Sequence, residues 1–260
     1  MYRVNVLQGL CYTGCMSVFK IVGIVSVVPL AGLIALILFG QHAEAPAPEA
    51  VSGTQTTPGM LRYLPLGDSY TIGQSVGADQ RWPNQLTKKL ENDNIHLKIV
   101  GNPAVTGYTS QDLIDRELPL VKTLQPDFVT VQIGVNDYVQ RVSIQTFQKN
   151  LNQILDAVQK GIPQPTKIVL VTIPDYAKTP TGAQYGDPVA ATAAIAAFND
   201  IIKITGSARG LPVADVFGVS QKVVSDPSLT ASDGLHPSGK QYALWTEEIF
   251  KTVTAAGTFK

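Results

Sequence analysis

Short apolar runs alternate with longer amphipathic stretches from residue 61 to the end of the chain. The apolar runs cover residues 61–66, 97–100, 128–133, 167–173 and 211–216, and helical patterns cover residues 83–93, 110–124, 144–160, 188–208 and 238–255. The third and fourth runs, FVTVQI and KIVLVTI, are almost continuously apolar, which is typical of strands covered on both faces. The alternation therefore predicts a three-layer α/β/α domain with a five-stranded parallel sheet and right-handed crossovers.

An uncharged stretch of twenty residues, IVGIVSVVPLAGLIALILFG, occupies positions 21–40. As a helix it matches the ~30 Å hydrocarbon core of a bilayer, so it predicts a transmembrane anchor. The sequence Ala43-Glu44-Ala45 fits the small-residue pattern of a signal-peptidase site, so a cleaved signal peptide stays open as the alternative. Because Arg3 and Lys20 precede the stretch, we expect the N-terminus in the cytoplasm and everything after the stretch on the other side.

These features divide the chain into four predicted parts. They are a cytoplasmic segment at 1–20, the hydrophobic helix at 21–40, a flexible Ala-, Pro-, Ser- and Thr-rich linker at 41–60, and the α/β domain at 61–260. A start at Met16 would give a conventional short n-region and would remove Cys11 and Cys15. These are the two cysteines of the chain, and both precede the predicted domain, so we expect neither a disulfide framework nor a cysteine zinc site there. The predicted location is the cell membrane with the domain outside, or secretion if the leader is cleaved.

The charge is balanced, with 20 Lys and Arg against 20 Asp and Glu. Nucleic-acid binding depends on an excess of positive charge, so we expect no nucleic-acid partner.

Polar, turn-forming loops follow the predicted strands. They read GDSY at 67–70, GNPAVTG at 101–107, GVND at 134–137 and, before the last helix, DGLHP at 233–237. In parallel sheets the chemistry lies beyond the carboxyl ends of the strands, where these loops converge.

Ser69 stands at a predicted strand-to-helix turn, where its hydroxyl could act as a nucleophile. On GDS alone, a helix cap formed by Asp68 or Ser69 is the better interpretation. A serine nucleophile needs a general base, and the chain has three histidines, His42, His96 and His236. His42 lies in the linker and His96 in a polar turn, which leaves His236 as the candidate base.

Asp233 precedes His236 by three residues in a tight Asp-Gly loop. It could accept a hydrogen bond from the imidazole Nδ1–H and so leave Nε2 free to take the serine proton. Asp68 and Asp137 adjoin the candidate residues, but we interpret both as loop hydrogen-bonding groups rather than as an acid/base pair.

These blocks, in this order, resemble the SGNH hydrolases, also called the GDSL esterase and lipase family, from residue 61 to about 255. The resemblance implies a flavodoxin-like α/β fold, a triad of Ser69, Asp233 and His236, and an oxyanion hole made by Ser69, Gly107 and Asn136. Pro103-Ala104 and Tyr70 depart from the commoner family wording. No metal or cofactor motif accompanies the blocks, and none is expected.

The resemblance further implies an extracytoplasmic serine ester hydrolase that works through an acyl-serine intermediate. The sequences of these motifs are most similar to those of bacterial lysophospholipase-type esterases, which favours lysophospholipid or short acyl ester substrates. The alternatives are an O-acetyl esterase or acyltransferase acting on cell-surface polysaccharide, and a silent domain that only binds acylated lipid or sugar.

A long loop at 174–188 carries Tyr176 and Tyr185. Loops of this length are often functional, so the two tyrosines are candidates for the substrate pocket. A variable surface loop is an equally good interpretation.

Overall fold

A five-stranded parallel sheet forms the centre of the computed structural model, which describes residues 59–260. Its strand order is β2-β1-β3-β4-β5. The strands are β1 (Leu61–Gly67), β2 (Leu97–Ile99), β3 (Phe128–Gln132), β4 (Ile168–Val171) and β5 (Val213–Ala214). The predicted fold class is confirmed. The expected segments at 1–20 and 21–40, and all but the end of the linker at 41–60, lie outside the described residues.

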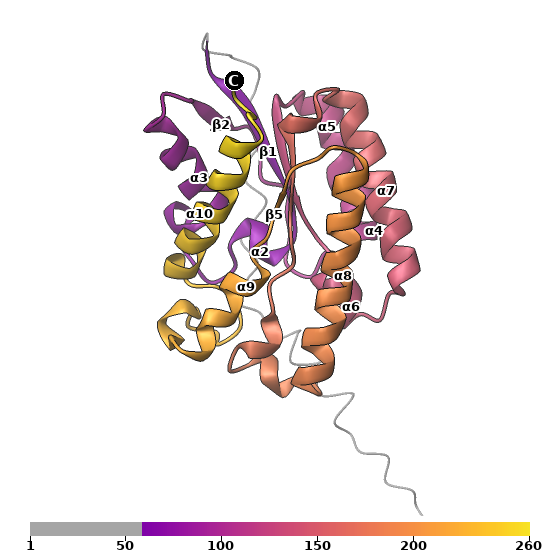
Figure 1. Cartoon of the computed structure of the whole chain (residues 1–260), viewed down its shortest axis with the longest axis vertical. Helices are drawn as coiled ribbons and strands as arrows, with labels where there is room; N and C mark the ends of the chain where they lie inside the picture. The colour runs from indigo at the N-terminus through magenta and orange to yellow at the C-terminus, as the bar shows by residue number, and fades with distance from the viewer. Residues whose placement is uncertain (1–58) are drawn as a thin grey trace, which may run out of the picture. The chain divides into compact units, whose positions relative to one another are not determined.

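Helices cover both faces of the sheet. The longer ones are α3 (Trp82–Glu91), α5 (Leu118–Leu124), α7 (Ile144–Gly161), α8 (Pro188–Ala208) and α10 (Gly239–Ala255). In Figure 1, α3 and α10 lie side by side on one face, and α5, α7 and α8 lie on the other. The result is the three-layer arrangement that the alternation of apolar runs and amphipathic stretches predicts.

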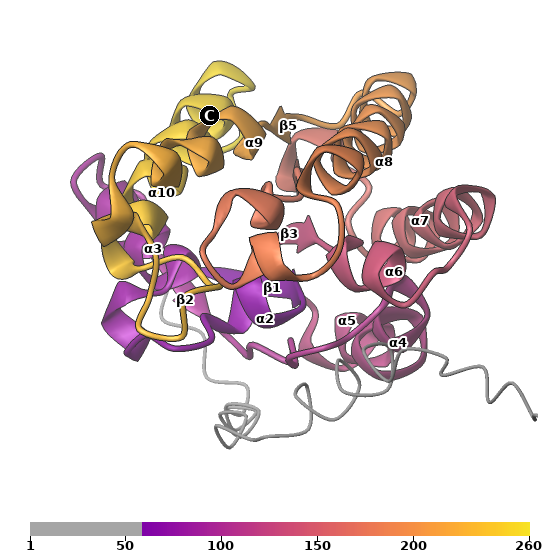
Figure 2. The same cartoon turned by 90° about the horizontal axis from the view of Figure 1, so that it is seen from below.

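The register of the sheet brings two of the polar loops together. β1 and β3 are neighbours, with Leu64 opposite Val129 and Gly67 opposite Gln132. Both strands therefore end at the same level, and the loops that begin at Asp68 and at Ile133 leave the sheet side by side. Figure 2 looks onto this carboxyl edge, where α2 (Ser69–Ile72) and α6 (Val135–Val139) start.

The core is filled by large side chains from the strands and from the inner faces of the helices. Trp82 at the start of α3 and Trp245 in α10 are fully buried, and these two helices pack closely on each other. Phe128 of β3 and Phe147 of α7 are buried on the strand and helix sides of the core. Burial of such aromatic side chains dominates the energetics of a core, which makes the sheet a rigid base for the loops at its edge.

The predicted helix at 110–124 is continuous but irregular. It consists of α4 (Ser110–Asp112), a π-helical turn η2 (Leu113–Glu117) and α5. Pro119, in the first turn of α5, has no N–H to donate to an earlier carbonyl, so regular α-helical hydrogen bonding cannot run through this point. The irregular turn places Glu117 in the interior, where its side chain is fully buried.

Within residues 59–260, α8 is the one helix long and apolar enough to cross a membrane. It packs against β5 and α7 and buries Ile195, Phe198 and Ile202. α8 is therefore explained as a covering helix of the domain.

Candidate active site

Ser69 is the first residue of α2, directly beyond β1. Asp68 is the N-cap of this helix, and its Oδ1 accepts a hydrogen bond from the Tyr70 amide at 3.0 Å. The capping interaction that the sequence left open is thus made by Asp68. The Ser69 amide lies in the first turn, where N–H groups have no acceptor within the helix.

Asp233 and His236 form a close pair in the loop before α10. Oδ2 of Asp233 lies 2.6 Å from His236 Nδ1, and Oδ1 accepts the backbone amides of Leu235 and His236, both at 2.9 Å. Partial burial acts to raise the pKa of the Asp233 carboxyl, but hydrogen bonds from His236 and Ser75 outweigh it and hold that pKa well below its usual range. Because an ionised carboxylate can only accept, Nδ1 carries the proton and Nε2 of a neutral His236 is left as a base.

The structure brings this pair to the helix that begins with Ser69. The ring of Tyr70 lies 5.7 Å from the imidazole of His236, and Ser75, just beyond α2, bonds Asp233. Among the described residues, the Ser69 hydroxyl does not form a hydrogen bond with His236. Such bonds are often long in free enzymes and tighten when substrate binds.

Asn136 and Gly107 come together at the same edge. Asn136 Nδ2 donates to the carbonyl of Tyr108 at 2.9 Å, and Gln140 Nε2 donates to the carbonyl of Gly107 at 3.0 Å. Gly107 has a φ of +89°, which favours glycine. An amide nitrogen carries two hydrogens, so Asn136 retains one donor besides the bond that anchors it.

Three buried carboxyls lie behind Ser69. Desolvation by burial raises the pKa of Asp68 to about 8, and the nearby Asp137 contributes to this increase. Burial also raises the pKa of Glu117, although the Gly67 amide donates to its Oε2 at 2.9 Å. Asp137 accepts from the amide and the hydroxyl of Ser110. Asp68 and Asp137 act as loop hydrogen-bonding groups, as the sequence suggested, and Glu117 joins them.

The loop at 174–188 supports the Asp233 loop. The Thr181 amide donates to the carbonyl of Gly234 at 2.8 Å, and the Thr181 hydroxyl donates to the backbone carbonyl of Asp233 at 3.0 Å. Figure 2 shows this loop, in orange, spanning the middle of the carboxyl edge. Tyr176 is 6% exposed and belongs to the core, and Tyr185 is half-buried against it. A substrate contact by either tyrosine stays a prediction.

The sequence alone gives no sign of the contacts that Ser75, Thr181 and Glu117 make at this edge. Ser75 meets a partner 158 positions away, Thr181 one 52 positions away, and Glu117 one 50 positions away. No local pattern marks such pairings, because they depend on how the loops meet at the sheet edge. His96, one of the two histidines that we did not select as the general base, is exposed in the turn before β2.

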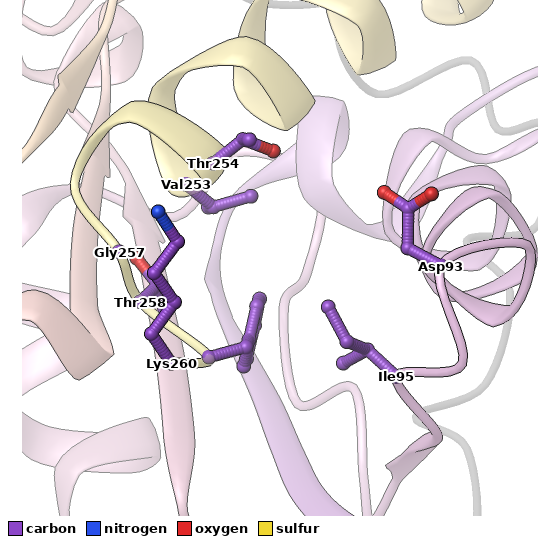
Figure 3. A pocket seen from close by; sticks show the side chains of 8 residues that line it. Asp93, Ile95, Val253, Thr254, Gly257, Thr258 and Lys260 are labelled. Carbon is purple, nitrogen blue, oxygen red and sulfur yellow. The ribbon is translucent and has the colours of Figure 1, made fainter.

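Across residues 59–260, no group of three or more His, Cys, Asp or Glu side chains could hold a metal ion. A hollow of about 190 Å³ lies at the opposite end of the sheet, between the C-terminal segment and the turn before β2 (Figure 3). Its lining includes Ile95, Val253 and Lys260 and none of the predicted catalytic residues.

A parallel α/β/α sandwich, with a serine at the start of the helix after β1 and an Asp-His pair before the last helix, is the arrangement expected of an SGNH hydrolase. Comparison with family models agrees with this class. Residues 66–244 match the model of the GDSL-like lipase/acylhydrolase family, and the chain belongs to that family.

Similar proteins include two curated enzymes. The thioesterase 1/protease 1/lysophospholipase L1 of Escherichia coli K12 is 27% identical over 175 residues, which cover 67% of this chain and 74% of the relative. An arylesterase of Vibrio mimicus is 22% identical over 176 residues, covering 68% of this chain and 80% of the relative.

Solved structures show the same fold. A lipase/acylhydrolase from Enterococcus faecalis superposes with a TM-score of 0.63 at 23% identity, covering 77% of this chain and 98% of that structure. An acetylxylan esterase from Geobacillus stearothermophilus gives a TM-score of 0.58 at 18% identity, covering 74% of this chain and 94% of that structure. The family match, together with the two curated relatives, identifies the chain as a carboxylic ester hydrolase.

Proposed function

We propose that the chain hydrolyses acyl esters outside the cytoplasm through an acyl-serine intermediate formed on Ser69. The observation that carries this proposal is the 2.6 Å contact between Asp233 and His236 Nδ1, in a loop packed beside the helix that Ser69 begins. That contact selects the imidazole tautomer whose Nε2 can accept a proton.

The proposed reaction has two steps. In the first, His236 Nε2 takes the hydroxyl proton as Ser69 Oγ bonds to the ester carbonyl carbon, and the proton then passes to the departing alcohol. In the second, water attacks the acyl-serine, again with His236 as base, and releases the carboxylic acid and free Ser69. Asp233 orients the imidazole and stabilises its positive charge.

The negative charge of each tetrahedral intermediate needs donors aimed at one oxygen. We assign this role to the amides of Ser69 and Gly107 and to the Asn136 side chain. The anchoring bond from Asn136 to the Tyr108 carbonyl supports this assignment, because it fixes the amide next to Gly107. A preorganised donor of this type contributes about 100- to 1000-fold to kcat.

The proposed substrates are lysophospholipids or short acyl esters. The lysophospholipase and arylesterase names of the two curated relatives support this class. The acyl chain length is the property that separates a lipid substrate from an O-acetyl group on polysaccharide.

Hydrolysis of p-nitrophenyl esters from acetate to palmitate tests the proposal, using the full chain in detergent. Ser69→Ala and His236→Ala should each abolish turnover while leaving the melting temperature close to that of the wild type. Ser207→Ala, at an exposed serine in the last turn of α8, is the matched control and should be fully active. A Ser69→Ala variant that turns over like the wild type would refute the mechanism.

The chain-length optimum then separates the substrate classes. An optimum at medium or long chains supports the lysophospholipid class, whereas activity confined to acetate supports O-acetyl sugars. Adding an acceptor alcohol and measuring the transferred acyl product distinguishes hydrolysis from acyl transfer, because water and alcohol compete for the same acyl-serine.

A further inference from the structure

We propose that Ser75 is a positioning residue of the active site, which holds Asp233 and through it sets the basicity and orientation of His236. This inference rests on the proposed function, because it assigns His236 as the general base. The Ser75 hydroxyl donates to Asp233 Oδ2 at 2.6 Å, and this is the same oxygen that contacts His236 Nδ1.

The four hydrogen bonds of the Asp233 carboxylate divide evenly between its two oxygens. Oδ1 receives the backbone amides of Leu235 and His236, and Oδ2 receives the side chains of Ser75 and His236. The backbone donors belong to the Asp233 loop itself. Ser75 is therefore the donor that reaches this carboxylate from a distant part of the chain.

The turn that carries Ser75 links the three predicted parts of the site. It follows α2 directly, with the amides of Gly73 and Gln74 both bonded to the carbonyl of Ser69. On one side, Gln74 Oε1 accepts from the Thr106 hydroxyl at 2.8 Å, beside Gly107. On the other side, Ser75 reaches Asp233. The nucleophile's helix is thus bonded to the loop of Gly107 and to the loop of His236.

The backbone at Ser75 is unusual for a residue with a side chain. Its φ is +68°, in the left-handed region where glycine is the default. Ser75 is also exposed, so core packing does not explain the residue type. The hydroxyl contact with Asp233 gives a reason for a serine at this position.

Sharing of Oδ2 has a predictable effect on His236. A second donor disperses the negative charge of the oxygen that stabilises the imidazolium. Without the Ser75 hydroxyl, that oxygen interacts more strongly with a charged His236, so the pKa of the imidazole should rise.

Other titratable groups near this pair do not reproduce the effect. Tyr70 of α2 and Tyr242 of α10 interact electrostatically with Asp233, and burial raises the pKa of both tyrosines, so both stay neutral. Asp68 and Asp175, which act on Tyr70, and Arg81, which acts on Tyr242, are further ionisable groups near this pair. None of the three is changed by a substitution at Ser75.

The test uses two substitutions, Ser75→Ala and Ser75→Gly, in the full-length protein. Both remove the hydroxyl, but only glycine relieves the left-handed backbone. We expect both to move the acidic limb of the pH profile of kcat/KM upward by about half a pH unit, a ~3-fold change in the proton equilibrium. The plateau of kcat/KM should fall by about 3- to 10-fold as His236 loses its fixed orientation.

Asn94→Ala is the matched control. Asn94 is also exposed, with a φ of +60°, but it lies in the turn before β2. This variant should change the melting temperature slightly and leave the pH profile as in the wild type. An unchanged acidic limb in both Ser75 variants would overturn the proposal. Wild-type behaviour of Ser75→Gly alone would also overturn it, because backbone strain would then be the cause of the Ser75→Ala effect.

A direct titration separates this inference from the proposed function. The imidazole signal of His236 is followed by NMR in the Ser69→Ala background, with and without Ser75→Ala, and is assigned by its loss in His236→Gln. A raised pKa of His236 supports the role of Ser75 without any turnover, and an unchanged pKa refutes it. Full esterase activity of Ser69→Ala would refute the proposed function instead, whatever the titration shows.

Discussion

The side-chain amide of Asn136 has two separate tasks at the residue scale. One hydrogen holds the loop of Gly107 through the Tyr108 carbonyl, and the other is available to a substrate oxyanion. Asn136→Ala should therefore lower kcat by about 100-fold and change KM much less, because the oxyanion forms only in the transition state. Steady-state kinetics on the best p-nitrophenyl ester measure this. An unchanged kcat would remove Asn136 from the oxyanion hole.

The ionisation of Asp68 gives a second prediction at this scale. With a pKa of about 8, the carboxyl is mostly neutral at pH 7 and becomes negative above pH 8. A buried negative charge beside Ser69 would oppose the developing oxyanion, so kcat should fall as the pH rises through about 8.

Asp68→Asn is the test of that prediction. Asparagine keeps an oxygen acceptor for the Tyr70 amide and is an equally good helix cap, but it cannot ionise. Its kcat should stay level above pH 8 where that of the wild type falls. The same decline in both proteins would show that another group titrates.

At the scale of elements, the irregular helix from α4 to α5 places the buried carboxyl of Glu117 behind the turn that carries Ser69. Burial raises the pKa of Glu117 above its unfolded value of about 4.3. Between these two pKa values the unfolded chain has lost the proton that the folded protein keeps. Rising pH therefore favours the unfolded state, and this contribution lowers stability from about pH 4.3 upward.

Glu117→Gln removes that pH dependence and keeps an oxygen for the Gly67 amide. The melting temperature of the variant, measured relative to the wild type, should increase steadily from pH 5 to pH 8. A constant difference across this range would mean that Glu117 does not hold a proton in the folded protein.

The sheet and its covering helices could be predicted from the sequence because each depends on local periodicity. The five apolar runs all contain strands, although β4 and β5 are each shorter than predicted. The short helices α2 and α6, by contrast, are set by the caps and turns at Asp68 and Gly134. A four- or five-residue helix is too short for periodicity to reveal.

The pairing of Asp233 with His236 could also be predicted from the sequence, because His236 follows Asp233 by only three positions. The contacts of Ser75 and Glu117 could not be predicted, because each crosses from one loop or helix to another across the carboxyl edge. Sequence spacing carries no signal for such contacts, which arise only once the sheet order is fixed.

At the scale of the whole molecule, we expect the predicted anchor at residues 21–40 to determine which compartment the catalytic domain occupies. The full chain should be found in the membrane fraction, with the domain accessible to protease from outside the cell. Deletion of residues 21–40 should leave the enzyme in the cytoplasm. Recovery of the intact full chain in the cytoplasm would contradict the proposed location, and recovery in the medium would show that the leader is cleaved.

The proposed mechanism depends on one covalent event, acylation of Ser69, and a fluorophosphonate probe measures the reactivity of this serine directly. Such probes bond irreversibly to an activated serine hydroxyl, at the oxygen to which the acyl group of a substrate bonds only transiently. We predict a mass increase of one adduct per chain, located on the peptide that contains Ser69 and absent in Ser69→Ala and His236→Ala. Adduct formation on another serine, or an active enzyme that the probe leaves unmodified, would contradict the account.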